Sequence, residues 1–124
     1  MRNYILLIFL FSFLNLFSQG VDPEIEIINF NSSVSYASGS SVSIHFNPSG
    51  VFDFVNAADL DDDLNNSFIL ELSGPGGDFN NPIVLNTAND FYTSLINGVL
   101  PEDIVPGEYK LRIRSTQPEL IEET

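Results

Sequence analysis

The stretch YKLRIRST, residues 109–116, alternates apolar and polar side chains from its first residue. Successive side chains of an extended chain point to opposite faces, so its apolar members share one face and its cations share the other. The apolar members are Tyr109, Leu111 and Ile113, and the cations are Lys110, Arg112 and Arg114. This two-residue period predicts a strand with one face on a hydrophobic core. The cations are expected to pair with acids on a neighbouring strand.

Two further segments show the same alternation, SVSIHFN at residues 41–47 and NSFILELS at residues 66–73. Their inward side chains would be Val42, Ile44 and Phe46 in the first segment and Phe68, Leu70 and Leu72 in the second. Shorter strands are expected at residues 24–30, 82–85 and 91–96. Nothing in the chain has the period of a long helix.

Turn residues separate these segments. NPSG at residues 47–50 and GPGG at residues 74–77 predict breaks in the chain, and Asn97-Gly98 predicts a tight turn. Pro118 is expected to end the last strand. The whole pattern predicts an all-β fold, an immunoglobulin-like antiparallel β-sandwich of about seven strands.

The segment LPEDIVPGEY, residues 100–109, leads into the last strand and adds a second indication of this fold. In immunoglobulin-type sandwiches a tyrosine near the start of a late strand hydrogen-bonds back to the backbone a few residues upstream. Tyr109 fits this tyrosine corner, with Leu111 as the next inward residue. The alternative is that Tyr109 is simply a core aromatic. Because the chain has no cysteine and no tryptophan, any likeness to antibody domains is one of architecture.

The first 20 residues, MRNYILLIFLFSFLNLFSQG, have the pattern of an export signal. Arg2 supplies a positive start, an apolar run follows, and small residues near the end suit cleavage after Ser18 or after Gly20. We expect residues 1–18 to be a signal peptide and the mature chain to be secreted or held at the cell surface. The alternative, a membrane anchor, needs about 20 apolar residues, so no membrane span is expected after cleavage.

Charge and composition exclude several classes of function. Without Arg2, three cations face 17 acids, a formal charge of 3 − 17 = −14. Nucleic-acid binding relies on cations that neutralise phosphates, so that class is excluded together with direct binding to anionic lipids. The lack of cysteine also excludes disulfides and a lipid-bearing cysteine, and the core must therefore form by hydrophobic burial alone.

An acidic run at residues 59–66 is the one candidate metal site. Asp59, Asp61, Asp63 and Asn65 have the spacing with which an EF-hand-type loop begins, and calcium prefers such oxygen ligands. The rest of that motif fails, because leucines stand where the glycine and the bidentate glutamate belong. The alternatives are a calcium site completed by acids from other loops and a solvated acidic loop. No other cofactor is expected.

Catalytic residues are hard to find in this chain. His45 is the single histidine, it falls on the outward face of a predicted strand, and no cysteine accompanies it. No serine stands in a nucleophile-elbow pattern, and no pair of carboxylates is singled out. The sequence therefore favours a non-catalytic protein.

Several motifs together resemble a known kind of module. They are YASGSSVSIHF at residues 36–46, NSFILELS at 66–73, GDFNNPIVL at 77–85 and PGEYKLRIRSTQP at 106–118. The set resembles the Ig-like repeats of secreted and cell-surface proteins of Bacteroidota, including gliding-motility-associated and adhesin-like proteins. This resemblance implies an Ig-like domain over residues 23–118. It also implies a tail or linker at residues 119–124, in what would be the N-terminal module of a longer chain.

Two functions fit this resemblance. The first is a structural or adhesive module that contacts other extracellular protein modules or surface polymers. The second is a carbohydrate-binding module of a secreted polysaccharide-acting protein, in which Tyr36 and Tyr92 would stack on sugar rings. The absence of tryptophan argues against the second function, so the structural or adhesive role is preferred.

Overall fold

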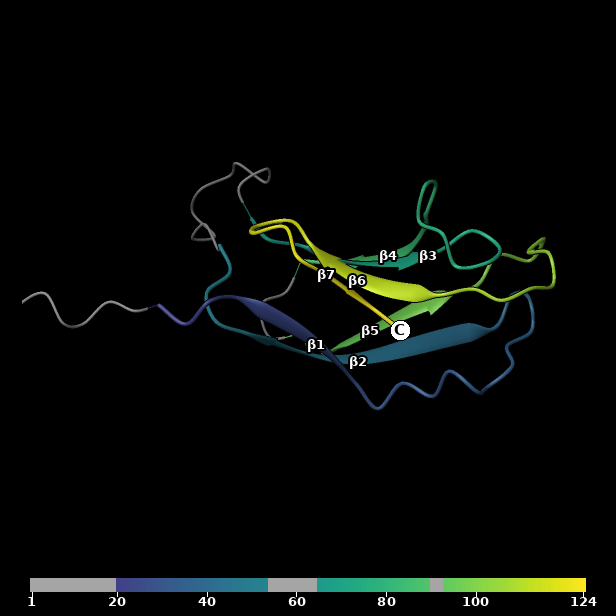
Figure 1. Ribbon diagram of the computed structural model, residues 1–124, viewed down its shortest axis with the longest axis horizontal. Helices are drawn as coiled ribbons and strands as arrows, with labels where there is room; N and C mark the ends of the chain where they lie inside the picture. Colours follow the sequence, from purple (N-terminus) through teal and green to yellow (C-terminus); the bar gives the residue numbers. More distant parts are fainter. Residues whose placement is uncertain (1–19, 54–64, 90–92) are drawn as a thin grey trace, which may run out of the picture.

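The computed structural model describes residues 20–53, 65–89 and 93–124. These residues form seven strands and no helix. The strands are β1 (Glu24–Ile28), β2 (Ser41–Ser49), β3 (Phe68–Leu72), β4 (Ile83–Ala88), β5 (Leu95–Val99), β6 (Leu111–Ser115) and β7 (Ile121–Glu123). They make two antiparallel sheets, one in the order β1-β2-β5 and the other in the order β4-β3-β6-β7. The sheets lie face to face as two layers (Figure 1), so the fold is a β-sandwich.

The core lies between the sheets and is built from the inward positions of the alternating strands. Phe46 of β2 and Phe68 of β3 meet across the sandwich with ring centroids 5.1 Å apart. Phe52, which follows β2, packs on Phe68 with centroids 5.3 Å apart in an edge-on arrangement. Tilted aromatic pairs contribute about 0.5–1.5 kcal/mol beyond the burial of their area. The alternation of β2, β3 and β6 thus places their apolar side chains as predicted.

The second strand continues through the predicted break at residues 47–50. Pro48 lies within β2 and pairs with Ile25 of β1. Proline is tolerated here because the Phe46 N–H, two residues earlier, points to the β5 side, where the Ser94 carbonyl accepts it at 3.0 Å. At Pro48 the pairing with β5 has already ended, so the missing N–H costs no ladder hydrogen bond. The strand stops one residue before Gly50, which has φ +85°.

The predicted tight turn at Asn97-Gly98 is wrong, because both residues lie inside β5. Gly98 faces the core at a point where the two sheets approach closely. A Cβ atom at this position would lie 2.7 Å from the Cβ atom of Leu85 on β4. An Asn86 side-chain amide donates to the Asn97 carbonyl at 2.6 Å, which links the same two strands across the sandwich. The glycine thus permits a close approach of strands and does not form a turn.

The C-terminal residues 119–124 were expected to be a tail or linker, and in the structure they belong to the sandwich. Ile121–Glu123 form β7, which pairs antiparallel with β6. The Thr124 N–H donates to the Leu111 carbonyl at 2.9 Å. The domain therefore extends past Pro118 to Thr124. A short edge strand carries little apolar alternation, which is why the sequence pattern did not reveal it.

The connection from β6 to β7 is tight and its polar atoms are paired. The Ser115 hydroxyl is fully buried, donates to the Pro118 carbonyl at 2.6 Å and accepts from the Leu120 N–H at 3.0 Å. None of the described residues belongs to a helix with the length and apolar character needed to cross a membrane.

Candidate functional site

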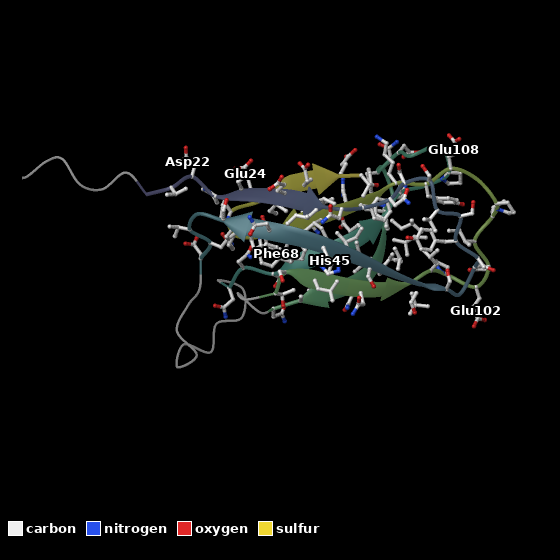
Figure 2. All side chains as sticks on the ribbon, turned by 90° about the horizontal axis from the view of Figure 1, so that it is seen from below. Asp22, Glu24, His45, Phe68, Glu102 and Glu108 are labelled. Carbon is white, nitrogen blue, oxygen red and sulfur yellow. The ribbon has the colours of Figure 1, made fainter. Side chains whose placement is uncertain are left out.

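A groove of about 790 Å³ opens at one end of the sandwich. It lies between residues 30–38, which follow β1, and residues 104–111, which lead into β6. Figure 2 shows Glu102 and Glu108 at this end of the molecule and Asp22 and Glu24 at the opposite end. The groove is therefore far from the point where the described chain begins.

The floor and the mouth of the groove differ in exposure. Four core side chains, each at most 8% exposed, form the floor; they are Val42, Leu72, Leu100 and Leu111. Three exposed apolar or aromatic side chains stand at the mouth, namely Val34 (48% exposed), Tyr36 (42%) and Val105 (65%). Partly buried Phe30, Ile104 and Tyr109 connect the two groups. The groove thus has an apolar floor that reaches the core and a mouth where serine side chains stand beside the apolar ones.

Tyr109 makes the hydrogen bond expected of a tyrosine corner. Its hydroxyl donates to the Val105 carbonyl, four residues upstream, at 2.8 Å. Its ring packs against the core and lines the groove. The bond ties residues 105–109 into a fixed arc. Tyr109 therefore shapes one wall of the groove as well as filling space.

Among the described residues, the segment just before β6 is held by hydrogen bonds on one side. The Glu108 carbonyl accepts from the Gly76 N–H at 2.8 Å, and the Lys110 carbonyl accepts from the Ser73 N–H at 2.9 Å. The Lys110 N–H donates to the Ser73 hydroxyl at 2.8 Å. All of these bonds point toward the loop that follows β3. The opposite edge, next to the groove, belongs to the intervening residue Tyr109.

The three cations predicted to pair with acids do so on the outer face of the second sheet. Glu71, whose side chain is 3% exposed, accepts from Arg112 Nε at 2.5 Å and lies 3.2 Å from Arg114 Nη2. Arg112 also stacks over the Phe79 ring, 4.3 Å from its centroid. Lys110 pairs with Glu123 at 3.5 Å, and both of these side chains are well exposed. Each of the three cations thus has a carboxylate partner, and Arg112 and Arg114 share Glu71.

The acids at the groove end are unpaired in the described part of the chain. Glu102, Asp103 and Glu108 are exposed, and no described cation lies within ion-pair distance of them. Negative charge without a paired cation attracts cations or cationic side chains. Of these acids Glu108 lines the groove, while Glu102 lies at the same end of the molecule (Figure 2).

The other residues singled out from the sequence are placed as follows. Tyr36 lines the mouth of the groove, whereas Tyr92 lies outside the described residues. Asp59, Asp61 and Asp63 also lie outside them. Asn65 is described; its carbonyl accepts from the Thr116 hydroxyl at 3.4 Å. Within residues 20–53, 65–89 and 93–124, no cluster of three or more acidic or histidine side chains suits a metal ion.

His45 lies where the sequence predicted, exposed on the outer face of β2. Its strand neighbours are Ile28 of β1 and Leu95 of β5. Both are partly exposed, at 37% and 41%. These neighbours supply no group that would activate a histidine for catalysis.

The groove itself was not predicted from the sequence. Its mouth is made by Val34, which stands among serines and small residues, and by Val105, which stands between turn-forming residues. Apolar side chains within such loop stretches are the only sequence signal of a binding surface here, and it is a weak one. Comparison of the chain with protein-family models, curated proteins and solved structures found no match.

Proposed function

We propose that this chain is a non-catalytic, extracellular, immunoglobulin-like module with a structural or adhesive role, which acts through contacts with other proteins. The observation that carries the proposal is the groove at one end of a small β-sandwich, where core side chains form an apolar floor that is open to solvent. Extracellular sandwiches use the loops clustered at their ends for recognition. The export signal at residues 1–18 is consistent with this location.

The strand order supports the immunoglobulin-like assignment. In that fold, strands A, B and E share one sheet, while C, F and G share the other, with C′ added beside C in some forms. Assigning β1, β2 and β5 to A, B and E leaves β4, β3, β6 and β7 as C′, C, F and G. This order reproduces both sheets. Tyr109 then stands between E and F, directly before F, where the tyrosine corner belongs.

Neighbouring modules fit this geometry. The described chain enters the sandwich at the end marked by Asp22 and Glu24, and β7 runs toward the other end (Figures 1 and 2). Modules of this kind can stack end to end with their loops in contact. In such a stack the groove would face a neighbouring module, which is a protein contact of the proposed kind.

Carbohydrate binding is the second candidate, and one observation favours it. Tyr36 is 42% exposed at the mouth of the groove, where its ring is accessible to a sugar. Serine side chains at the mouth, among them Ser33 and Ser35, add hydroxyl groups that suit hydrogen bonds to a sugar. Against it, the floor of the groove is apolar and is formed by core side chains.

A glycan array with residues 19–124 separates the two functions. The protein-contact role predicts no glycan bound above background, for the wild-type chain and for Tyr36→Ala alike. A glycan that binds the wild-type chain and is lost with Tyr36→Ala would establish the carbohydrate function instead. Val84→Ala is the control, because Val84 is 56% exposed on β4 and does not line the groove.

A further inference from the structure

Charged side chains are unevenly distributed over the strands. β1 and β7 carry two glutamates each, namely Glu24, Glu26, Glu122 and Glu123. By contrast, β2, β4 and β5 contain no Asp, Glu, Lys or Arg. Residues 27–52 of the sequence contain no such side chain, and residues 79–101 contain only Asp90, which lies outside the described residues. A strongly negative chain thus has long segments without charge.

The topology places the acidic and the uncharged edge strands on opposite flanks of the sandwich. β1 and β5 are the edges of the first sheet, and β7 and β4 are the edges of the second. β1 lies beside β7, and β4 lies beside β5. Figure 2 shows β1 (purple) and β7 (yellow) at one flank and β5 (green) at the other. The flank made by strands β4 and β5, here termed the neutral flank, therefore has no charged side chain on either strand.

The outer edge of β5 has backbone groups that no strand pairs. The Phe46 N–H of β2 donates to the Ser94 carbonyl at 3.0 Å, so even-numbered residues from Ser94 onward direct their backbone groups to β2. The odd-numbered residues direct theirs outward, namely Leu95, Asn97 and Val99. Among the described residues, the Asn86 side-chain amide reaches this edge and donates to the Asn97 carbonyl at 2.6 Å. Because a carbonyl can accept a second hydrogen bond, the edge remains open to another strand.

The β5 edge lacks the usual features that prevent pairing with another chain. Proteins commonly protect an edge strand with charged side chains, especially Lys, or with proline. β5 contains neither, whereas both strands of the opposite flank carry glutamates. Leu95 and Val99 are also 41% and 59% exposed. A strand that pairs with β5 would thus gain backbone hydrogen bonds and apolar contacts together.

Electrostatic repulsion selects a second copy of the chain as the partner that must use this flank. Each copy is strongly negative, so two copies repel each other wherever their acids approach. With the neutral flanks in contact, the glutamates of β1 and β7 lie on the far side of each copy. A basic partner would instead be attracted to the acidic surfaces. A two-fold axis brings the same strand of both copies together antiparallel, so the β5 edge is complementary to itself.

We propose that two copies of the chain associate through the neutral flank, with their β5 edges paired antiparallel about a two-fold axis. An axis centred on Asn97 pairs this residue with its own copy and places Leu95 opposite Val99 of the second copy. These three residues direct their backbone groups outward, so this register uses the free groups of the edge. The three-stranded sheets of the two copies then join into one continuous sheet.

This association goes beyond the protein contact proposed for the groove, because it uses a different surface. The groove lies between residues 30–38 and residues 104–111 at one end of the sandwich, and none of residues 95–99 lines it. A chain that does not dimerise can still bind a partner in the groove. A chain that dimerises through β5 does not thereby need one.

Analytical ultracentrifugation of residues 19–124 tests the association over concentrations from about 1 μM to about 1 mM. We expect a concentration-dependent change from monomer to dimer. The dissociation constant should be at least about threefold lower in concentrated than in dilute sodium chloride, because salt screens the repulsion between the acids of the two copies. A chain that stays monomeric over this range would leave the edge to a different protein and overturn the proposal. So would a dimer that salt weakens.

Hydrogen exchange locates the contact on the chain. The amides of Leu95, Asn97 and Val99 should exchange quickly in dilute solution and at least about tenfold more slowly where the dimer predominates. The Ile96 amide is directed to β2 in both states and should change little. Protection confined to residues of the groove, such as Tyr36, would show that the second copy occupies the groove and would contradict the pairing through β5.

A matched pair of lysine variants tests the flank. Val99→Lys and Ile121→Lys each replace an exposed apolar residue of an edge strand, at 59% and 47% exposure, and add the same charge. Val99→Lys should weaken the dimer at least about tenfold, since a lysine on an edge opposes pairing, and Ile121→Lys on the acidic flank should change it less than about twofold. Leu95→Lys, at the other end of the same edge, should act like Val99→Lys. Circular dichroism confirms that each variant is folded, and equal effects on the two flanks would refute the proposal.

Discussion

At the scale of single residues, close contacts decide which side chains the sandwich tolerates. Gly98 sits where β5 meets β4, and its missing side chain lets the two sheets approach at this edge. Glu71 is held by two arginines on an otherwise solvated face. Tyr109 closes an arc of backbone through its hydroxyl. Substitution of each of these residues is expected to lower the free energy of unfolding by a measurable amount.

Gly98→Ala should lower the free energy of unfolding by about 1–3 kcal/mol, the usual cost of forcing extra volume into a packed site. The added methyl group would meet the Leu85 Cβ at 2.7 Å and a Leu70 methyl at 3.1 Å. Urea denaturation measures the change. Gly20→Ala is the control, because nothing lies within 4 Å of its added Cβ. Equal stability of the two variants would contradict the close approach of β4 and β5.

Glu71→Gln should lower stability by about 2 kcal/mol, because it leaves Arg112 and Arg114 without their carboxylate in a partly buried position. The arginine side chains are 13% and 25% exposed, which keeps this cost below that of a fully buried pair. Lys110→Gln removes the exposed pair with Glu123 and should cost no more than about 1 kcal/mol. A larger loss for Lys110→Gln than for Glu71→Gln, in the same denaturation series, would refute this ranking.

Tyr109→Phe should cost about 1 kcal/mol, the net value of one hydrogen bond, since the ring itself remains in place. The bond lost is the one to the Val105 carbonyl. Tyr36→Phe serves as the comparison, because the Tyr36 hydroxyl makes no hydrogen bond with a described residue. Thermal melts of both variants measure the difference. Similar melting temperatures would mean that the corner adds nothing to stability.

At the scale of elements, the strands that close the sandwich differ in how they are held. β2 and β3 lie inside their sheets and carry the aromatic core. β7 is a three-residue edge strand, held by its pairing with β6 and by the hydrogen bonds of Thr124 with Leu111. The boundary of the domain therefore depends on residues whose sequence carries little sign of a strand.

Removal of residues 119–124 tests this boundary. We expect truncation after Pro118 to lower the free energy of unfolding by about 2–4 kcal/mol, because several hydrogen bonds of β6 lose their partners together. Circular dichroism during urea denaturation provides the measurement. An unchanged midpoint would mean that these residues are a tail, as their sequence suggested.

The regular strands were predictable from sequence because a two-residue period and burial go together. The alternation in 41–47, 66–73 and 109–116 marked β2, β3 and β6 and their inward residues. The turns predicted at Pro48 and Gly98 were wrong. Pro48 fits within β2 because the pairing with β5 has already ended there. Gly98 fits within β5 because the two sheets approach closely at that position. The same alternation also predicted that the cations pair with acids on a neighbouring strand. It could not show that Glu71 is their main partner, because that depends on the register between β3 and β6.

The candidate site was mostly invisible in the sequence. Tyr109 was recognisable because its position relative to the last long strand is characteristic of the fold. The groove forms from two loops about 70 residues apart in the chain, and no local pattern predicts that such loops face each other. Tyr36 was identified as an accessible aromatic, while its neighbours Val34 and Val105 were not. The acids at residues 59–63 remain a calcium hypothesis outside the described residues.

At the scale of the whole molecule, the distribution of charge and apolar surface favours contact with a protein. All described cations are used within the chain, and the acids of the groove end are not. The core reaches the surface at this end through the floor of the groove. These features suit contact with a partner protein at this end of the molecule.

Binding to intact cells tests this account most directly. Fluorescent residues 19–124 are added to cells of the source organism that lack the chain, before and after treatment of those cells with protease or with glycosidases. The account predicts saturable binding that protease treatment abolishes, that glycosidases leave unchanged, and that Glu102→Gln with Glu108→Gln weakens. Binding that survives protease treatment and disappears after glycosidase treatment would contradict it.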